Sequence, residues 1–214
     1  CQSVVSTFAG TGEIGYNGDN ILAIEAKLNK PVNISTDQNG NIYITENGSS
    51  RIRVVNTDGI ITTFAGNGSA GYSGDGGLAT LAKIRKPIAA MPDAYGNIYI
   101  ADYLNNRIRK VTIADGIITT VAGTGIYGSN EDSLPALETN LSYAGDVSFD
   151  SNGNYYITDH DANCIRKVNI NTGISTIVAG NGSFTYNGDG IAATAASLLH
   201  PSSTTFDNNQ NLII

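Results

Sequence analysis

The feature that most constrains the fold of this chain is an internal repeat that runs from one end to the other. The dipeptide Ala-Gly recurs with a nearly constant period of 56–57, beginning at Ala9, Ala65, Ala122 and Ala179. A proline position follows each of these dipeptides at a constant offset, and it is occupied by Pro31, Pro87, Ala144 and Pro201. A period of this length indicates that one supersecondary unit is copied along the chain and that neighbouring copies stack on one another.

Each copy contains four short segments rich in Ile, Val, Thr and Tyr. In the first copy these segments are residues 32–36, 41–45, 51–55 and 60–65, and the turn dipeptides Asn39-Gly40 and Asp58-Gly59 separate them. The extra residue of the longer copies falls in the turn between the third and fourth segments, where insertions are tolerated. Four antiparallel strands that meander in this way predict a blade of a β-propeller, and hence an all-β protein.

The pattern predicts a single domain with three complete four-stranded blades at residues 31–66, 87–123 and 144–180. Part-blades are expected at residues 1–10 and 201–214. Between each Ala-Gly and the next proline position, small apolar residues such as Ala23, Ala26 and Leu28 predict short helical turns. We interpret this segment as a decorated connection between blades and not as a fifth strand.

Three passages in register resemble the NHL repeat, a β-propeller family. They are Gly40–Ile44, Gly96–Asp102 with Asn106–Val111, and Gly153–Asp159 with Asn163–Val168, and the similarity extends over essentially the whole chain. Glu46 and Cys164 depart from the family pattern, which has aspartate and arginine at these places.

NHL propellers commonly have six blades, so the resemblance implies that this chain forms part of a larger ring. Residues 3–8 are then expected to form the last strand of one blade, and residues 211–214 the second strand of another. We expect such a segment to be an open arc or to associate with itself through its open blade edges, because unpaired strand edges attract further strands.

Composition excludes two classes of partner. The net charge is -7 and the pI is about 4.6, which leaves no basic excess to neutralise nucleic acid. No apolar run approaches the roughly 18 residues of a spanning helix, so membrane insertion is not expected. Two cysteines, Cys1 and Cys164, are too few for a disulfide framework. The sequence does not determine the cellular compartment of the protein, and it weakly favours an extracellular or cell-surface location.

Residues that recur in every copy are most simply explained by folding. One recurring set is acidic and is expected to cap the helical turns: Asp19, Asp75, Asp132 and Asp189. A second recurring set is basic and is expected to contact carboxylates or carbonyls beside its own blade: Arg53, Arg109 and Arg166. Tyr16, Tyr72 and Tyr186 are expected to pack on a neighbouring loop, and Ser129 replaces this tyrosine without a visible compensation.

Residues that differ between copies are better candidates for ligand binding. Asn33 and Asp146 lie in the first strand of their blades, which lines the central channel of a propeller, and His160 and Asp161 lie in a loop between strands. The chain has only two histidines, too few for a site with three imidazoles, and no nucleophile or phosphate-loop motif. The sequence therefore predicts no catalytic residues, no metal site and no cofactor.

We interpret the chain as a non-enzymatic NHL-like scaffold whose loops bind a protein or a small ligand. One alternative is part of a calcium-dependent six-bladed hydrolase or lyase, which would need acidic and amide side chains converging on the channel. The other is a carbohydrate-binding propeller, for which the absence of Trp is unfavourable.

Overall fold

The computed structural model describes residues 4–214, and its strands form three complete sheets and the beginning of a fourth. The first sheet contains β1 (Ile21–Leu22), β2 (Pro31–Thr36), β3 (Ile42–Glu46), β4 (Arg51–Val55) and β5 (Ile60–Ala65). The second contains β6 (Gly77–Leu78), β7 (Ala89–Pro92), β8 (Ile98–Asp102), β9 (Arg107–Val111) and β10 (Ile117–Ala122). The third contains β11 (Leu134–Pro135), β12 (Ala144–Phe149), β13 (Tyr155–Asp159), β14 (Cys164–Val168) and β15 (Ile174–Ala179). The fourth begins with β16 (Thr205–Phe206) and β17 (Leu212–Ile213).

The propeller prediction is confirmed, but each complete blade has five strands and not four. All described strand pairs are antiparallel, and the order within the first sheet is β1-β5-β4-β3-β2. Each complete blade has one strand that we did not predict: β1 in the first, β6 in the second and β11 in the third. Each pairs through two residues with the outermost long strand of its sheet. It forms because the connection runs back along β5, β10 or β15, whose free edge it covers.

Short 3-10 helices form where the small apolar residues predicted helical turns, and in the three complete blades each follows the extra strand directly. They are η1 (Ala23–Glu25), η2 (Ala79–Leu81), η4 (Ala136–Glu138) and η5 (Ala193–Ala195), and η3 (Tyr103–Asn105) lies instead between β8 and β9. No helix among residues 4–214 is long and apolar enough to cross a membrane.

The hairpin turns are where the sequence placed them, although their type is different. Gly40 and Gly59 have φ of 84° and 78°, whereas Asn39 and Asp58 do not have positive φ, so these are not type I′ turns. In the first turn the Asp37 carboxylate accepts hydrogen bonds from the amides of Asn39 and Asn41. These hydrogen bonds stabilise the turn, which therefore needs only one residue of positive φ.

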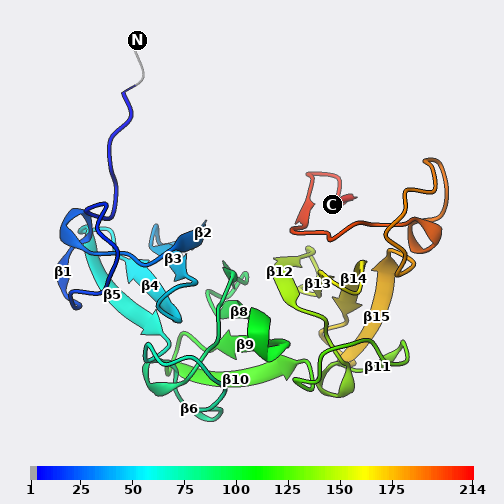
Figure 1. Ribbon diagram of the computed structural model, residues 1–214, viewed down its shortest axis with the longest axis horizontal. Coiled ribbons are helices and arrows are strands. Elements are labelled where there is room, and N and C mark those ends of the chain that lie inside the picture. The colour runs from blue at the N-terminus through cyan, green and yellow to red at the C-terminus, as the bar shows by residue number, and fades with distance from the viewer. Residues whose placement is uncertain (1–3) are drawn as a thin grey trace.

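The sheets follow one another along an arc that is open between its two ends (Figure 1). In this view β2 and β12 lie on the concave side, and β5, β10 and β15 lie on the convex side. Neighbouring sheets bury apolar side chains between their faces, such as Tyr43 and Ile52 of the first sheet against Ala90 and Ile98 of the second. Polar side chains also link neighbouring blades on this inner side. Ser35 of β2 donates to the Ala90 carbonyl of β7, and the Ser148 hydroxyl of β12 lies 2.7 Å from that of Thr204, just before β16.

The two ends of the chain differ from each other. Residues 4–8, which we expected to continue a strand begun at residue 3, form no strand, because no described neighbour pairs with them, and residue 3 lies outside the described residues. At the other end β17 is the second strand of its sheet, paired with β16.

Candidate functional site

The recurring arginines lie in the blades, away from solvent. The side chains of Arg53, Arg109 and Arg166 are at most 1% exposed. Arg109 donates to Asp75 at 2.6 Å and lies 3.5 Å from Asp102, and Arg53 has the same relation to Asp19 and Glu46. Arg166 lies 2.8 Å from Asp159 and 3.8 Å from Asp132. The expected contacts with carboxylates are therefore present in all three blades.

The more deeply buried carboxylate beside each arginine also binds the segment that leads into the first long strand of its blade. The Asp102 carboxylate accepts the Arg85 amide at 2.7 Å, and the Asp159 carboxylate accepts the Ser142 amide at 2.6 Å. Burial raises the pKa of Asp102 to about 6, against the opposing effect of its hydrogen bonds and of Arg109. The pair thus links one strand to the next, which is a structural task that every blade shares.

The recurring aspartates do not cap the helical turns, so our expectation for Asp19, Asp75, Asp132 and Asp189 was wrong. The N-cap residues of η1, η2, η4 and η5 are Leu22, Leu78, Pro135 and Ala192, none of which makes a side-chain cap hydrogen bond. The carboxylates of Asp19, Asp75 and Asp132 are drawn to the recurring arginines instead, because an ion pair with a buried guanidinium satisfies two charges at once.

A tyrosine–arginine stack accompanies this ion pair in the first two blades. The guanidinium of Arg51 lies 4.1 Å from the Tyr16 ring centre, and that of Arg107 lies 3.8 Å from the Tyr72 ring centre. Each tyrosine hydroxyl donates to the neighbouring recurring aspartate. The guanidinium of Arg107 also donates to the carbonyls of Asn105 and Thr124.

The third blade has lost both members of this stack. Ser129 stands at the tyrosine position and Cys164 at the arginine position, so the replacement at Ser129 has a compensation that sequence reading missed. A cavity of about 440 Å³ lined by both residues takes the place of the stack, against about 210 Å³ beside Tyr16 and Arg51. Cys164 is buried, and burial raises the pKa of its thiol to about 12, which keeps it protonated.

Asn33 and Asp146 lie in the innermost strands β2 and β12, as expected, but they do not form a common site. Asp146 is 7% exposed, and its Oδ2 accepts the Thr204 amide at 3.4 Å while its Oδ1 has no hydrogen-bond partner. Burial raises the pKa of Asp146 to about 6. In the described part of the chain, no hydrogen bond or ion pair joins either residue to His160 or Asp161.

His160 and Asp161 belong to a larger group, the Tyr–His cluster, which contains Tyr103, Tyr127, Tyr143, His160, Asp161 and His200. At its centre the Asp161 carboxylate accepts hydrogen bonds from His160 Nδ1 at 2.7 Å and from the Tyr127 hydroxyl at 2.9 Å. Nδ1 of His200 lies 3.4 Å from the same carboxylate. The aromatic rings pack on one another, with centres 4.7 Å apart for Tyr103 and Tyr143 and also for His160 and His200.

The cluster spans three sheets because loops from the same end of each blade converge. Tyr103 comes from the loop after β8, His160 and Asp161 come from the loop after β13, and Tyr143 and His200 each precede an innermost strand. Tyr143 and His200 have φ of 63° and 45°. Tyr127 is 54% exposed and the His200 side chain is 52% exposed, so the cluster is open to solvent.

Electrostatics keep the central carboxylate ionised. Burial raises the pKa of Asp161, but hydrogen bonds from His160 and Tyr127 outweigh this effect, and the net shift is downward. The hydrogen bond to Asp161 raises the pKa of Tyr127, and burial followed by the Asp161 charge raises the pKa of Tyr103. The hydroxyl of Tyr127 therefore remains a donor, and Asp161 remains an acceptor.

Comparison between the repeats shows that the fold does not require these residues. Equivalent places hold Asn47 and Gly48 for His160 and Asp161, and they hold Lys30 and Lys86 for Tyr143 and His200. Sequence reasoning found His160 and Asp161 but missed the other four residues, which lie far apart in the chain. The variation at the place before each proline position was the available signal.

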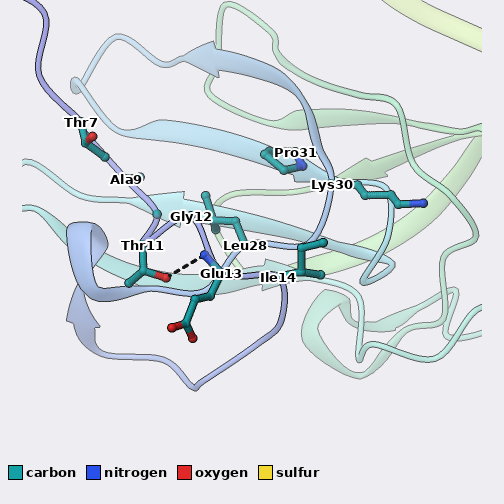
Figure 2. A pocket seen from close by; sticks show the side chains of 10 residues that line it. Thr7, Ala9, Thr11, Gly12, Glu13, Ile14, Leu28, Lys30 and Pro31 are labelled. Carbon is teal, nitrogen blue, oxygen red and sulfur yellow. Dashed lines mark hydrogen bonds between the residues drawn. The ribbon is translucent and has the colours of Figure 1, made fainter.

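A cavity of about 570 Å³ at the N-terminal end of the arc has fewer functional side chains than the Tyr–His cluster (Figure 2). Thr7, Ala9, Gly10 and Gly12 line part of it, and the Thr11 hydroxyl accepts the Glu13 amide at 3.2 Å. Figure 2 shows the charged ends of Glu13 and Lys30 pointing in different directions. Since Glu13 instead pairs with Lys27 at 2.6 Å, no group of polar side chains converges here.

Comparison with known proteins agrees with the blade architecture. Residues 9–73 match the family model of the teneurin NHL domain. Teneurin-3 of Mus musculus is 31% identical over 171 residues, which are 70% of this chain. Teneurin-m of Drosophila melanogaster is 31% identical over 191 residues, which are 83% of this chain. The chain is an NHL-repeat β-propeller.

This NHL propeller spans only 6% of the length of either teneurin. Among solved structures, that of a nidogen/laminin complex aligns with 80% of the chain and 49% of its own chain, with a TM-score of 0.51 and 16% identity. Similarity at this level of identity establishes the propeller fold and carries no information on the site.

Proposed function

We propose that this NHL propeller is a non-enzymatic scaffold that binds a protein partner through the Tyr–His cluster. The observation that carries the proposal is that tyrosine and histidine rings and a carboxylate, none of them required by the repeat, converge from three blades on one exposed end. Residues that vary within a conserved frame are the ones free to serve recognition.

The side chains of the Tyr–His cluster are of the kinds that bind the surface of another protein. Tyrosine is enriched at the energetically dominant positions of interfaces, because its ring buries a large area with little loss of conformational freedom while its hydroxyl forms a hydrogen bond. Asp161 adds a negative charge at the centre, which favours a partner that presents a basic or hydrogen-bond-donating side chain. That a propeller of the same fold occurs in the structure of a nidogen/laminin complex supports a protein as the class of ligand.

The calcium-dependent enzyme is less well supported. In the described part of the chain, the innermost strands β2, β7, β12 and β16 contribute one carboxylate, Asp146, which is buried and already accepts the Thr204 amide. Calcium takes six to eight oxygen ligands, which this arrangement does not supply. The teneurin relatives are consistent with an extracellular or cell-surface setting for the partner, which is part of the proposal.

The test is site-specific crosslinking. A photoreactive amino acid at position 127 should capture a defined partner, whereas the same group at position 95 should not, because β8 separates the Tyr95 turn from the Tyr103 end of the blade. Tyr95 is a matched control, since it is an exposed tyrosine at 84% exposure.

With the captured partner purified, Tyr127→Ala should weaken its binding at least tenfold, and Tyr95→Ala should leave the affinity unchanged. Equal capture from both positions, or equal loss of affinity in both variants, would show that this end of the propeller is not the binding face.

A further inference from the structure

The two histidines of this chain are distant in the sequence, and in the fold they meet at one carboxylate. His160 Nδ1 lies 2.7 Å and His200 Nδ1 lies 3.4 Å from the same Oδ1 of Asp161. One potential ligand atom from each of the three side chains lies within 4.8 Å of the others. The rings of His160 and His200 are stacked on one another, with an interplanar angle of 25°.

We propose that His160, Asp161 and His200 form a binding site for a Zn²⁺ ion. Zinc binds imidazole nitrogen at about 2.0–2.1 Å and carboxylate oxygen at about 2.0–2.2 Å, so adjacent ligands of a tetrahedral site lie about 3.3 Å apart. The His200 to Asp161 distance of 3.4 Å already meets this requirement. The His160 to Asp161 distance of 2.7 Å is that of a hydrogen bond, and it must lengthen by about 0.6 Å when zinc replaces the proton on Nδ1.

Hydrogen bonds fix the backbone of the three ligand residues before any ion arrives. The amide of Asp161 donates to the Ser142 carbonyl at 2.9 Å, and the amide of His160 donates to the Tyr143 carbonyl at 3.3 Å. The amide of His200 donates to the Asn163 side chain at 3.0 Å. A site whose ligands come from an ordered backbone loses less conformational entropy when it binds its ion.

Surrounding groups supply the outer shell that metal sites need. The Tyr127 hydroxyl donates to Asp161 Oδ2 at 2.9 Å, which leaves Oδ1 toward the two imidazoles. Tyr103 packs edge-on against His160 and restricts the orientation of its ring. Three protein ligands leave one tetrahedral position open, as in zinc sites that accept an external ligand. If the proposed function holds, the zinc ion takes the place of a basic group beside Asp161, and an imidazole or carboxylate of the partner occupies the open position.

The expectation that the chain binds no transition metal rested on its having only two histidines and on no single blade carrying enough acidic or imidazole ligands. That argument excludes a site of three imidazoles but not one of two imidazoles and a carboxylate, and the sequence separation concealed the convergence. The equivalent places in the other repeats combine Asn47 and Gly48 with Lys86, or Leu104 with Tyr143, so this combination occurs only at the junction of the third and fourth blades in the described chain.

The test is calorimetric titration of the full chain with Zn²⁺ alone, in a Cys1→Ser background so that the N-terminal thiol does not contribute. We expect one ion per chain. His200→Gln and Asp161→Asn should each lower the affinity at least tenfold, because each removes one ligand and both side chains are partly exposed, so the fold tolerates the change. Asp58→Asn, an exposed turn carboxylate, is the matched control and should leave the affinity unchanged.

Thermal unfolding with and without Zn²⁺ provides a second readout, since an ion that binds only the folded state raises Tm. We expect the rise in the Cys1→Ser protein and its loss in both ligand variants. Absence of binding at millimolar Zn²⁺, or an affinity that the ligand variants do not change, would overturn the site. The titration contains no partner, so its outcome is separate from that of the crosslinking test.

Discussion

Asp146 shows at the scale of one residue how burial sets chemistry in this propeller. Its carboxyl is 7% exposed, has one oxygen without a hydrogen-bond partner, and has a pKa raised to about 6 by burial. The folded protein therefore holds a proton on Asp146 at pH values where the unfolded chain, with a pKa near 3.9, has released it. The stabilisation that this protonation brings is complete below about pH 4 and is lost as the pH rises to about 6.

Asp146→Asn should remove this pH dependence while it preserves the size of the side chain. As the pH rises from 4 to 7, the free energy of unfolding of the variant should increase by about 2 to 3 kcal/mol relative to that of the parent protein. The parent loses this stability when Asp146 ionises, because its pKa is raised by about two units in the folded state. Urea denaturation of both proteins across this range measures the difference. A difference that stays constant with pH would mean that Asp146 is ionised in the folded state.

Arg109 represents the recurring buried arginines, and its loss should be severe. Arg109→Ala leaves Asp102 and Asp75 without their buried counter-charge and should cost about 3 to 5 kcal/mol. Arg107→Ala, on the same strand but on the tyrosine stack, should cost only about 1 kcal/mol. Thermal and urea unfolding of the two variants compare them directly, and equal costs would contradict the structural role assigned to Arg109.

At the scale of elements, a blade can form without the tyrosine–arginine stack. The third blade folds with Ser129 and Cys164 in place of the stack and keeps the same strand order as the others. The Ala162 and Asn181 segments, whose counterparts in the second blade accept the Arg107 guanidinium through their carbonyls, still line the cavity.

Restoring the stack should therefore stabilise the third blade. We expect Ser129→Tyr with Cys164→Arg to raise the free energy of unfolding, with a coupling of about 1 kcal/mol beyond the sum of the single substitutions. Each single variant lacks the other half of the pair and serves as its control. A double-mutant cycle by urea denaturation gives the coupling, and additivity would show that the two places do not interact.

The long strands could be predicted from the sequence because alternating apolar residues and turn dipeptides mark each of them. β1, β6 and β11 could not, because a strand of two residues has no period and forms only through its contact with the strand beside it. For the same kind of reason, only His160 and Asp161 of the Tyr–His cluster could be predicted. His160 and Asp161 are adjacent, whereas Tyr127 and His200 are brought near only by the curvature of the arc.

At the scale of the whole molecule, the arc leaves one sheet face without a neighbour. Val32 and Ile34 of β2 are 53% and 69% exposed, whereas Ala90 and Val147, the counterparts of Ile34 in the next two blades, are fully buried between sheets. The inner face that stacks blades is the same in each repeat, and in the first blade it meets solvent.

The open arc should be measurable in solution. A compact chain of 214 residues has a radius of gyration of about 17 Å, and an arc should exceed it. We expect X-ray scattering on the dilute monomer to give a larger value, and we expect association at higher concentration through the exposed face of β2. Ile34→Lys should reduce that association. A monomer with a radius of gyration no larger than that of the compact chain would contradict the open arrangement.

The residue before each proline position has one backbone conformation in all four repeats, with φ of 51°, 48°, 63° and 45° at Lys30, Lys86, Tyr143 and His200. A left-handed backbone at a residue with a side chain is uncommon, so the surrounding loop must impose it. Because lysine, tyrosine and histidine all occur in this conformation, the loop does not depend on one particular side chain at this place. Single substitutions at these regularly spaced places can therefore change the surface that the loops present while the backbone of the loop stays the same.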